Sequence, residues 1–213
     1  MREVNNAELS LFKQELKKVL DYLLMYLKNP VQAIRFLPEW QWPTLLAVIG
    51  SAAAISGTVA GILQASIGQT LLGLLIFPIS ATISVAIISG FYYYSCFFLF
   101  KRKALYQRLF TLVILASFPT LVLNLFSAFL PPINLLGLFI SSILLIVGLS
   151  DNFMIDRKST IKLVFSVYII YVLIWIGSIL GTRTHESKLN ERIQPKSLEI
   201  LKQELDDQQS EEL

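Results

Sequence analysis

Cysteine, histidine and charged residues are scarce in this chain of 213 residues. Cys96 is the only cysteine and His185 the only histidine, which excludes a disulfide within one chain and a cluster of thiolate metal ligands. His185 lies beside Glu186 in a polar C-terminal segment, where a lone histidine is most simply a solvated side chain. We therefore expect neither a metal site nor a cofactor.

The scarcity of charge follows a pattern along the chain. Only 15% of the residues are charged and 54% are hydrophobic, with a mean hydropathy of +0.62, which is unlike a soluble globular domain. No charged residue occurs between Glu39 and Lys101, and this stretch accommodates two helical crossings of roughly 20 residues each. The pattern predicts an integral membrane protein. Its basic residues form separate blocks, which argues against nucleic-acid binding.

Motifs for catalysis are also lacking. The predicted spans contain no interior Asp, Glu, Lys, Arg or His, the residues on which proton relays and carboxylate ion sites depend. The sequence has no HExxH pair, no GxSxG elbow and no Walker loop, so hydrolytic and nucleotide chemistry lacks its residues. We expect a protein that is not an enzyme. A passive pore lined by hydroxyl groups stays open as an alternative.

What the sequence does contain is a series of long apolar segments separated by polar or proline-rich breaks. These predict transmembrane helices over residues 44–63, 71–100, 109–130, 135–149 and 162–180. The segment 135–149 is short enough to be re-entrant or interfacial instead, because a crossing usually needs about 18 residues or more. The fold class is thus all-α, a polytopic bundle of about five transmembrane helices preceded by an amphipathic interfacial helix.

The N-terminal segment has the periodicity of that amphipathic helix. Between Glu8 and Lys28 the charged residues Lys13, Lys17 and Asp21 lie opposite an apolar face, which comprises Leu9, Phe12, Leu16, Val19, Leu20, Leu23 and Leu27. We predict three regions: a cytosolic amphipathic segment over 1–40, a transmembrane domain over 41–181 and a polar tail over 182–213. The tail is either a solvated end or a docking helix for a partner.

Lysine and arginine determine the expected orientation, because they are enriched in cytosolic loops. They occur in the N-terminal segment, in the loop of Lys101, Arg102, Lys103 and Arg108, and after the fourth predicted span. The alternate loops, 64–70 and 131–134, contain no charged residue. This alternation predicts a cytosolic N-terminus and an extracytoplasmic C-terminus. Positions that could also bind anionic lipid are Lys13, Lys17, Lys101, Arg102, Lys103 and Arg108.

Small residues, prolines and one amide stand out within the spans. GxxxG spacing favours close helix packing, inside one subunit or between subunits, and the candidate contacts are Gly50, Ala54, Gly57, Gly61, Gly177 and Gly181. Pro78 and Pro119 interrupt apolar segments, and each is expected to kink its helix. Asn124 is expected to form a polar contact between helices.

The order of these features resembles prokaryotic members of the YIP (Ypt/Rab-interacting protein) membrane family. The resemblance spans about residues 20–180 and depends on these motifs: Asn29-Pro30, Ala33-Ile34-Arg35-Phe36-Leu37, Ala116-Ser117-Phe118-Pro119, the Pro131 turn and Gly148-Leu149. It implies five helices, a cytosolic N-terminus and a bacterial inner membrane. Eukaryotic relatives act with small GTPases in vesicle traffic, but the Asp-Leu-Tyr-Gly-Pro and Gly-Tyr-Gly signatures of that branch are absent here, which argues against GTPase binding.

Two functions are consistent with these observations. The first is a non-enzymatic scaffold or adaptor that organises lipids, other membrane proteins or copies of itself. The second is a membrane subunit of a transporter, or a passive pore. A pore would require a continuous polar path between helices, for which the candidate residues are Asn124, Ser117, Ser142 and Thr82.

Overall fold

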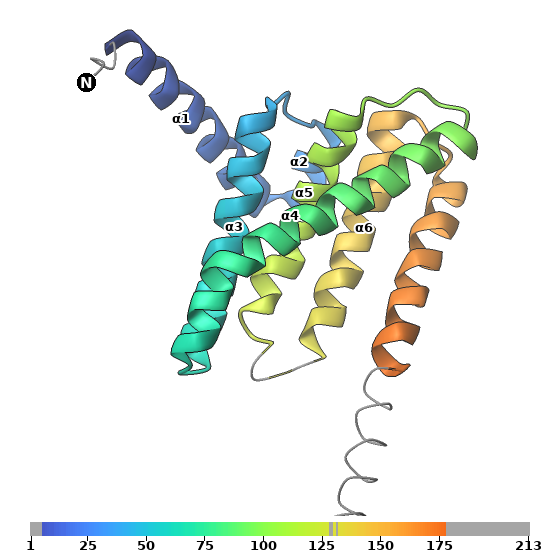
Figure 1. Ribbon diagram of the computed structural model, residues 1–213. Helices are drawn as coiled ribbons and strands as arrows, with labels where there is room; N and C mark the ends of the chain where they lie inside the picture. The colour runs from blue at the N-terminus through green and yellow to red at the C-terminus, as the bar shows by residue number, and fades with distance from the viewer. Residues whose placement is uncertain (1–5, 128–129, 131, 178–213) are drawn as a thin grey trace, which may run out of the picture. The chain divides into compact units, whose positions relative to one another are not determined.

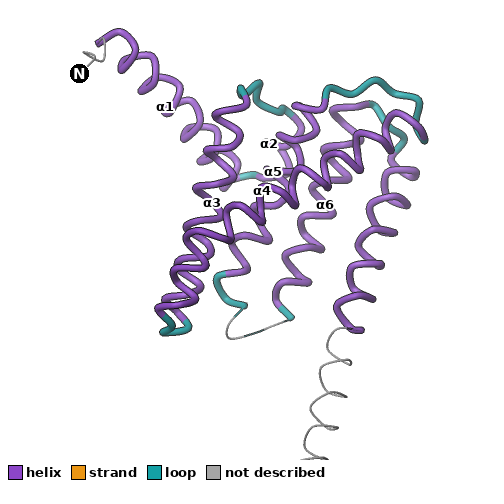
Figure 2. The backbone as a smooth tube through the Cα atoms, viewed as in Figure 1, coloured by secondary structure: helices purple, strands orange, loops and turns teal. Residues whose placement is uncertain are grey.

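The computed structural model describes residues 6–127, 130 and 132–177, and side chains from residue 14 onward. The chain divides into two compact units, residues 1–168 and 169–213. Secondary structure in the described residues is entirely helical, without strands (Figure 2). Five of the helices are long and apolar enough to cross a membrane, which confirms the predicted fold class.

The helix boundaries differ from the predicted ones by a few residues. The observed helices are α1 (Asn6–Lys28), α2 (Pro30–Arg35), α3 (Trp42–Leu63), α4 (Ile67–Phe98), α5 (Tyr106–Asn124), α6 (Ile133–Phe153) and a last helix, Arg157–Gly177. The segment predicted as 135–149 is a helix of 21 residues, long enough to cross because the polar residues after Leu149 continue it. The third span ends at Asn124, earlier than the predicted residue 130. The predicted end of the last span, residue 180, lies outside the described residues.

Helix α5 is the centre of the bundle. All eight side chains of residues 109–116 are buried, and α2, α3, α4 and α6 each pack against this helix. Burial on every side is typical of a central helix rather than an amphipathic surface one. The hydroxyl of Thr120 on α5 also lies 2.8 Å from that of Ser141 on α6, a polar contact of the kind that joins membrane helices.

Helices α3 and α4 form a tight antiparallel pair at the start of α4. Ser66 caps α4 by accepting a hydrogen bond from the backbone N–H of Gln69, because the first amides of a helix have no partner within it. Pro78 lies inside α4, and this helix starts beside α3 and then crosses in front of α5 (Figure 1). The change of direction along α4 agrees with the bend that an internal proline introduces.

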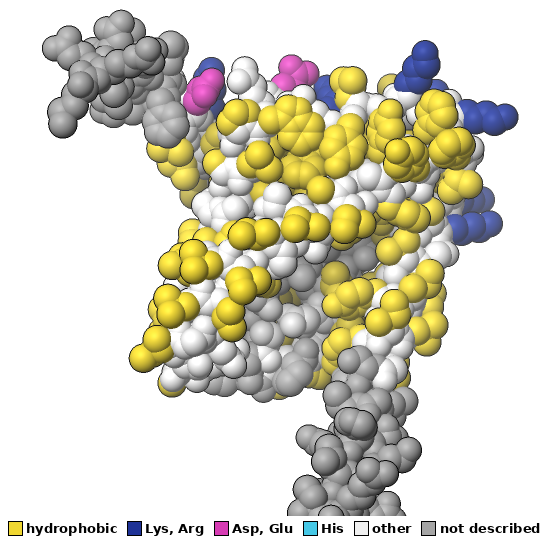
Figure 3. Space-filling model, viewed as in Figure 1, with side chains coloured by type: hydrophobic (Ala, Val, Ile, Leu, Met, Phe, Trp, Pro, Cys, Tyr) yellow, Lys and Arg dark blue, Asp and Glu magenta, His cyan; other side chains and the backbone are white. Residues whose placement is uncertain are grey.

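Charged side chains gather at one end of the bundle (Figure 3). Two ion pairs, Arg35 with Asp151 and Arg108 with Glu39, connect α2 to the end of α6 and the start of α5 to the segment before α3, and Lys101 to Lys103 lie in the connection between α4 and α5. The described residues of the connections at the opposite end, 64–66, 125–127, 130 and 132, include no charged residue. The structure therefore brings the separate charged blocks of the sequence to the same end of the bundle.

Candidate functional site

The charged end is built around α2, a helix of only six residues whose end groups are bonded by its neighbours. Asn29 precedes α2, and its side-chain oxygen accepts a hydrogen bond from the backbone N–H of Gln32 at 3.1 Å. The Tyr22 hydroxyl on α1 donates to the carbonyl of Ala33 at 2.9 Å. The Asn152 amide on α6 donates to the carbonyl of Ile34 at 2.9 Å. The first bond satisfies an amide at the start of α2, and the other two reach carbonyls of its last turn, so both ends of this short helix have partners.

The side chains of α2 also attach this helix to its neighbours by packing. Ala33 and Ile34 are fully buried, and α2 contacts α1, α5 and α6. Arg35 forms an ion pair with Asp151 of α6, with 3.0 Å between Nε and Oδ2. Both side chains are about half exposed, so this pair contributes less to stability than the buried contacts. Together they hold the C-terminal end of α1 and all of α2 against the bundle.

Tyr26 connects α1 directly to the central helix. Its side chain is buried, and its hydroxyl donates a 2.6 Å hydrogen bond to the backbone carbonyl of Leu115 on α5. In a regular helix that carbonyl would accept from the N–H of residue 119, but residue 119 is proline and has no N–H. The Tyr26 hydroxyl thus occupies the acceptor that Pro119 leaves free. Its ring packs on Phe118, with 5.7 Å between ring centroids.

Burial favours the neutral form of both tyrosines in α1. It raises the pKa of the Tyr22 hydroxyl to about 12 and raises that of the Tyr26 hydroxyl further, because a phenolate would lose its hydration. Both hydroxyls therefore remain hydrogen-bond donors at physiological pH.

The remainder of α1 extends away from the bundle (Figure 1). Val19 and Tyr26 face inward and are buried, and among the described helices α2 to α6 the backbone of α1 packs against α2. A row of leucines stays exposed beside the charged face of this helix: Leu16 (48%), Leu20 (52%), Leu24 (57%) and Leu27 (67%). We call residues 14–28 the arm and these four residues the leucine stripe.

The basic residues singled out from the sequence lie at this end of the bundle. Lys17, Lys101, Arg102 and Lys103 are exposed. Arg108 is also exposed and pairs with Glu39, with 3.4 Å between Nη2 and Oε1. The side chain of Lys13 lies outside the described part of the chain. These positions could face anionic headgroups, which stays a prediction.

The predicted small-residue contacts divide into two groups. A Cβ on Gly57 would lie 2.5 Å from the carbonyl oxygen of Gly73, and a Cβ on Gly61 would lie 2.5 Å from the Cα of Thr70. These two glycines therefore lie where α3 and α4 touch backbone to backbone. A Cβ on Gly50 or on Gly177 would meet no atom within 4 Å, while Ala54 is half-buried. Gly181 lies outside the described residues.

The hydroxyls of the predicted polar path bond within their own helices. Ser117, Ser142 and Thr82 each donate to a carbonyl four residues earlier in their own helix. Asn124 reaches a different helix, because its amide lies 3.4 Å from the Ser56 hydroxyl on α3. Ser56 in turn donates to the carbonyl of Leu121 in the last turn of α5. These bonds join α3 to α5.

Sequence reasoning missed the residues that fix the arm. Tyr22, Tyr26 and Asn152 bond to carbonyls 11, 89 and 118 positions away, and no periodicity reveals such partners. The proline at position 119 was a usable signal, since it predicts a free carbonyl four residues earlier. Within the described residues, no three His, Cys, Asp or Glu side chains gather as a possible metal site.

Comparison with known proteins places this architecture in a family. The model of the Yip1 domain matches residues 26–179, from Tyr26 through α2 and all five apolar helices. Most of the leucine stripe precedes the matched region. No curated protein and no solved structure matches the chain. The family match covers well over half of the sequence and agrees with five membrane-spanning helices, and the chain belongs to the Yip1 domain family of membrane proteins.

Proposed function

We propose that this protein is a non-enzymatic membrane scaffold or adaptor that presents the arm to other membrane proteins at the cytosolic surface. The observation that carries the proposal is the mounting of α1. Its C-terminal turns are fixed by Tyr22 and Tyr26, while the leucine stripe is exposed. A row of leucines at helical spacing is the pattern by which an amphipathic helix docks in an apolar groove.

The distribution of charge supports a cytosolic location for the arm. The exposed lysines and arginines lie at the end where α1 leaves the bundle (Figures 1 and 3), and positive residues favour the cytosolic side. With five crossings, the C-terminal tail would then be extracytoplasmic. We propose the bacterial inner membrane as the location of this chain.

The attachment of the C-terminal turns of the arm to the bundle argues for recognition rather than simple anchoring. Five apolar helices already hold the chain in a membrane, so an added interfacial helix contributes little to retention. Fixing a helix in its binding orientation, on the other hand, lowers the ordering cost of association. An adaptor benefits from such preorganisation.

The test asks whether partner binding depends on the apolar side chains of the leucine stripe or only on the presence of a helix there. In one variant Leu16, Leu20 and Leu24 are changed to glutamine; in the control the same three are changed to methionine. Glutamine and methionine have similar helix propensities, but only methionine keeps the surface apolar. Each tagged protein is purified in native lipid, and the accompanying proteins are quantified by mass spectrometry.

We expect a stoichiometric partner with the wild type and the methionine variant, and its loss with the glutamine variant. Equal partner recovery from all three proteins would show that the leucine stripe does not recruit it. Recovery of the wild-type chain alone would overturn the adaptor function.

A further inference from the structure

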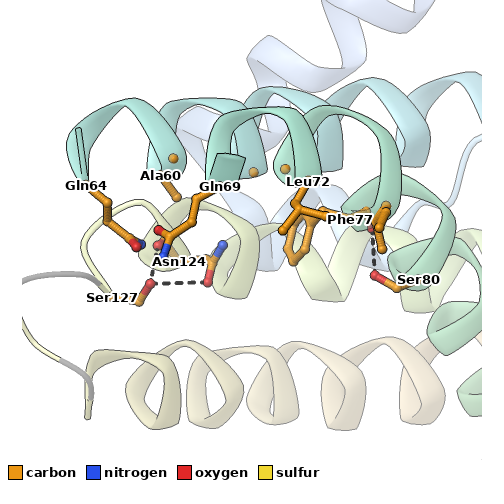
Figure 4. A pocket seen from close by; sticks show the side chains of 12 residues that line it. Ala60, Gln64, Gln69, Leu72, Phe77, Ser80, Asn124 and Ser127 are labelled. Atoms are coloured by element: carbon orange, nitrogen blue, oxygen red, sulfur yellow. Dashed lines mark hydrogen bonds between the residues drawn. The ribbon is translucent and has the colours of Figure 1, made fainter. Parts of the chain in front are cut away.

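A second feature lies at the uncharged end of the bundle, away from the arm. There α3, α4 and the end of α5 line an open cavity of about 310 Å³ (Figure 4). This volume is at the lower end of the range of small-molecule pockets, about 300–1,000 Å³. The cavity can therefore accept a headgroup and the first part of a chain, but not a whole lipid.

One side of the cavity is polar but carries no charge. Gln64 from the end of α3, Gln69 from the start of α4, and Asn124 and Ser127 from the end of α5 converge there (Figure 4). Ser127 donates to the backbone carbonyl of Asn124 at 2.7 Å. Within the described residues the two glutamine side chains form no hydrogen bond to protein, so their amides are available both to donate and to accept.

The other side of the cavity is apolar and opens toward the lipid-facing surface. Leu72, Ile76 and Phe77 of α4 line it, and Leu72 and Ile76 are more than half exposed. Its floor consists of Gly57 and Gly73, where the backbones of α3 and α4 touch. Because glycine has no side chain to fill this space, the close helix contact leaves a hollow beside it.

We propose that this cavity binds an uncharged glycerolipid whose free hydroxyl and ester carbonyl groups bond to the amides of Gln64, Gln69 and Asn124. The acyl chain nearest the glycerol would lie against Leu72 and Phe77. A polar cluster that continues into an apolar groove matches the polarity of such a lipid near its glycerol. Entry is from the bilayer, because the apolar side of the cavity faces it.

The absence of charge in the lining excludes an anionic lipid as the preferred ligand. Among the residues that the structure describes, no lysine, arginine or histidine lines the cavity, and no charged residue occurs between Glu39 and Lys101 or between Arg108 and Asp151. A phosphate placed there would lose hydration without gaining a counter-ion. The proposal does not depend on the adaptor function, since the two features lie on different residues at opposite ends.

The test uses diacylglycerol with a diazirine in the acyl chain near the glycerol, incorporated with the protein in lipid nanodiscs. We expect light-dependent labelling of α3 and α4 peptides at the cavity. Excess unlabelled diacylglycerol or glucosyl-diacylglycerol should compete, and phosphatidylglycerol should not. Equal competition by phosphatidylglycerol would show that the cavity does not select uncharged headgroups and would overturn the proposal.

Two pairs of variants locate the site. Leu72→Trp fills the cavity, whereas Leu71→Trp changes the adjacent and equally exposed residue, which does not line it. We expect loss of labelling only in Leu72→Trp. Changing both Gln64 and Gln69 to leucine should weaken labelling about tenfold through lost hydrogen bonds, with thermal unfolding unchanged because both side chains are exposed. Equal labelling of the Leu72 and Leu71 variants would also overturn the proposal.

Discussion

The bond between Tyr26 and the carbonyl freed by Pro119 gives a quantitative prediction about how the arm is held. Tyr26→Phe removes the hydroxyl that donates to Leu115 at 2.6 Å but keeps the ring against Phe118. The carbonyl then has no donor within its helix, because residue 119 is proline. A buried acceptor left without a partner costs about 1–3 kcal/mol, and we expect this loss in the free energy of unfolding.

The Pro119→Ala background should reduce that loss. Alanine at this position supplies the backbone N–H that the Leu115 carbonyl otherwise lacks, so removing the Tyr26 hydroxyl leaves no empty acceptor. The loss should then fall to about 0.5–1.5 kcal/mol, the net value of an ordinary hydrogen bond. We therefore expect a coupling energy between Tyr26 and Pro119 of about 1 kcal/mol, a size found for residues in contact.

Reversible unfolding by SDS titration in bicelles, followed by circular dichroism, measures the four free energies of this double-mutant cycle. Tyr22→Phe is the matched control, because the Tyr22 hydroxyl donates to carbonyls of residues 33 and 36, which Pro119 does not affect. It should be additive with Pro119→Ala. If the Tyr26 and Pro119 changes are additive within about 0.5 kcal/mol, the explanation of this contact is refuted.

Three further predictions concern packing and topology. Gly57→Ala would place its Cβ 2.5 Å from the carbonyl oxygen of Gly73, whereas the Cβ of Gly50→Ala on the same helix would meet no atom within 4 Å. We expect thermal unfolding in detergent to show that Gly57→Ala is less stable than Gly50→Ala by about 1–3 kcal/mol. Equal stability of the two variants would contradict the observed contact between α3 and α4. Asn152→Ala removes the donor to the Ile34 carbonyl. We expect amide hydrogen exchange to become faster in α2 and to stay unchanged in α3. Unaltered exchange in α2 would show that this bond does not fix α2. Asn190→Cys, in a background without the native cysteine, should react with an impermeant thiol reagent in intact cells, and protection would overturn the extracytoplasmic tail.

The number and identity of the spans could be predicted from the sequence, because both follow from local composition. Long uncharged segments between polar breaks correspond to helices α3 to α6 and Arg157–Gly177. The boundaries were less accurate for a physical reason. Asp151 and Asn152 end the apolar segment but still lie in α6, because Asp151 pairs with Arg35 and Asn152 bonds to α2.

Contacts between distant segments were beyond prediction from local pattern. The glycine spacing on α3 indicated close packing but not its partner, which is Gly73 on α4. Asn124 was expected to bond across helices, but the cavity that it shares with Gln64 and Gln69 exists only because three helix ends meet. Sequence indicates which side chains are unusual in a membrane, whereas the fold decides what each one contacts.

Helix α5 contributes to both proposed sites through backbone carbonyls that accept hydrogen bonds from other helices. Its Leu115 carbonyl is bonded by a hydroxyl from the arm, and its Leu121 carbonyl, near the cavity, is bonded by the hydroxyl of Ser56 on α3. In both cases a carbonyl without a helical N–H partner in an apolar interior requires a donor from another helix. The free acceptors of one central helix therefore fix the arm at the charged end and the wall of the cavity at the uncharged end.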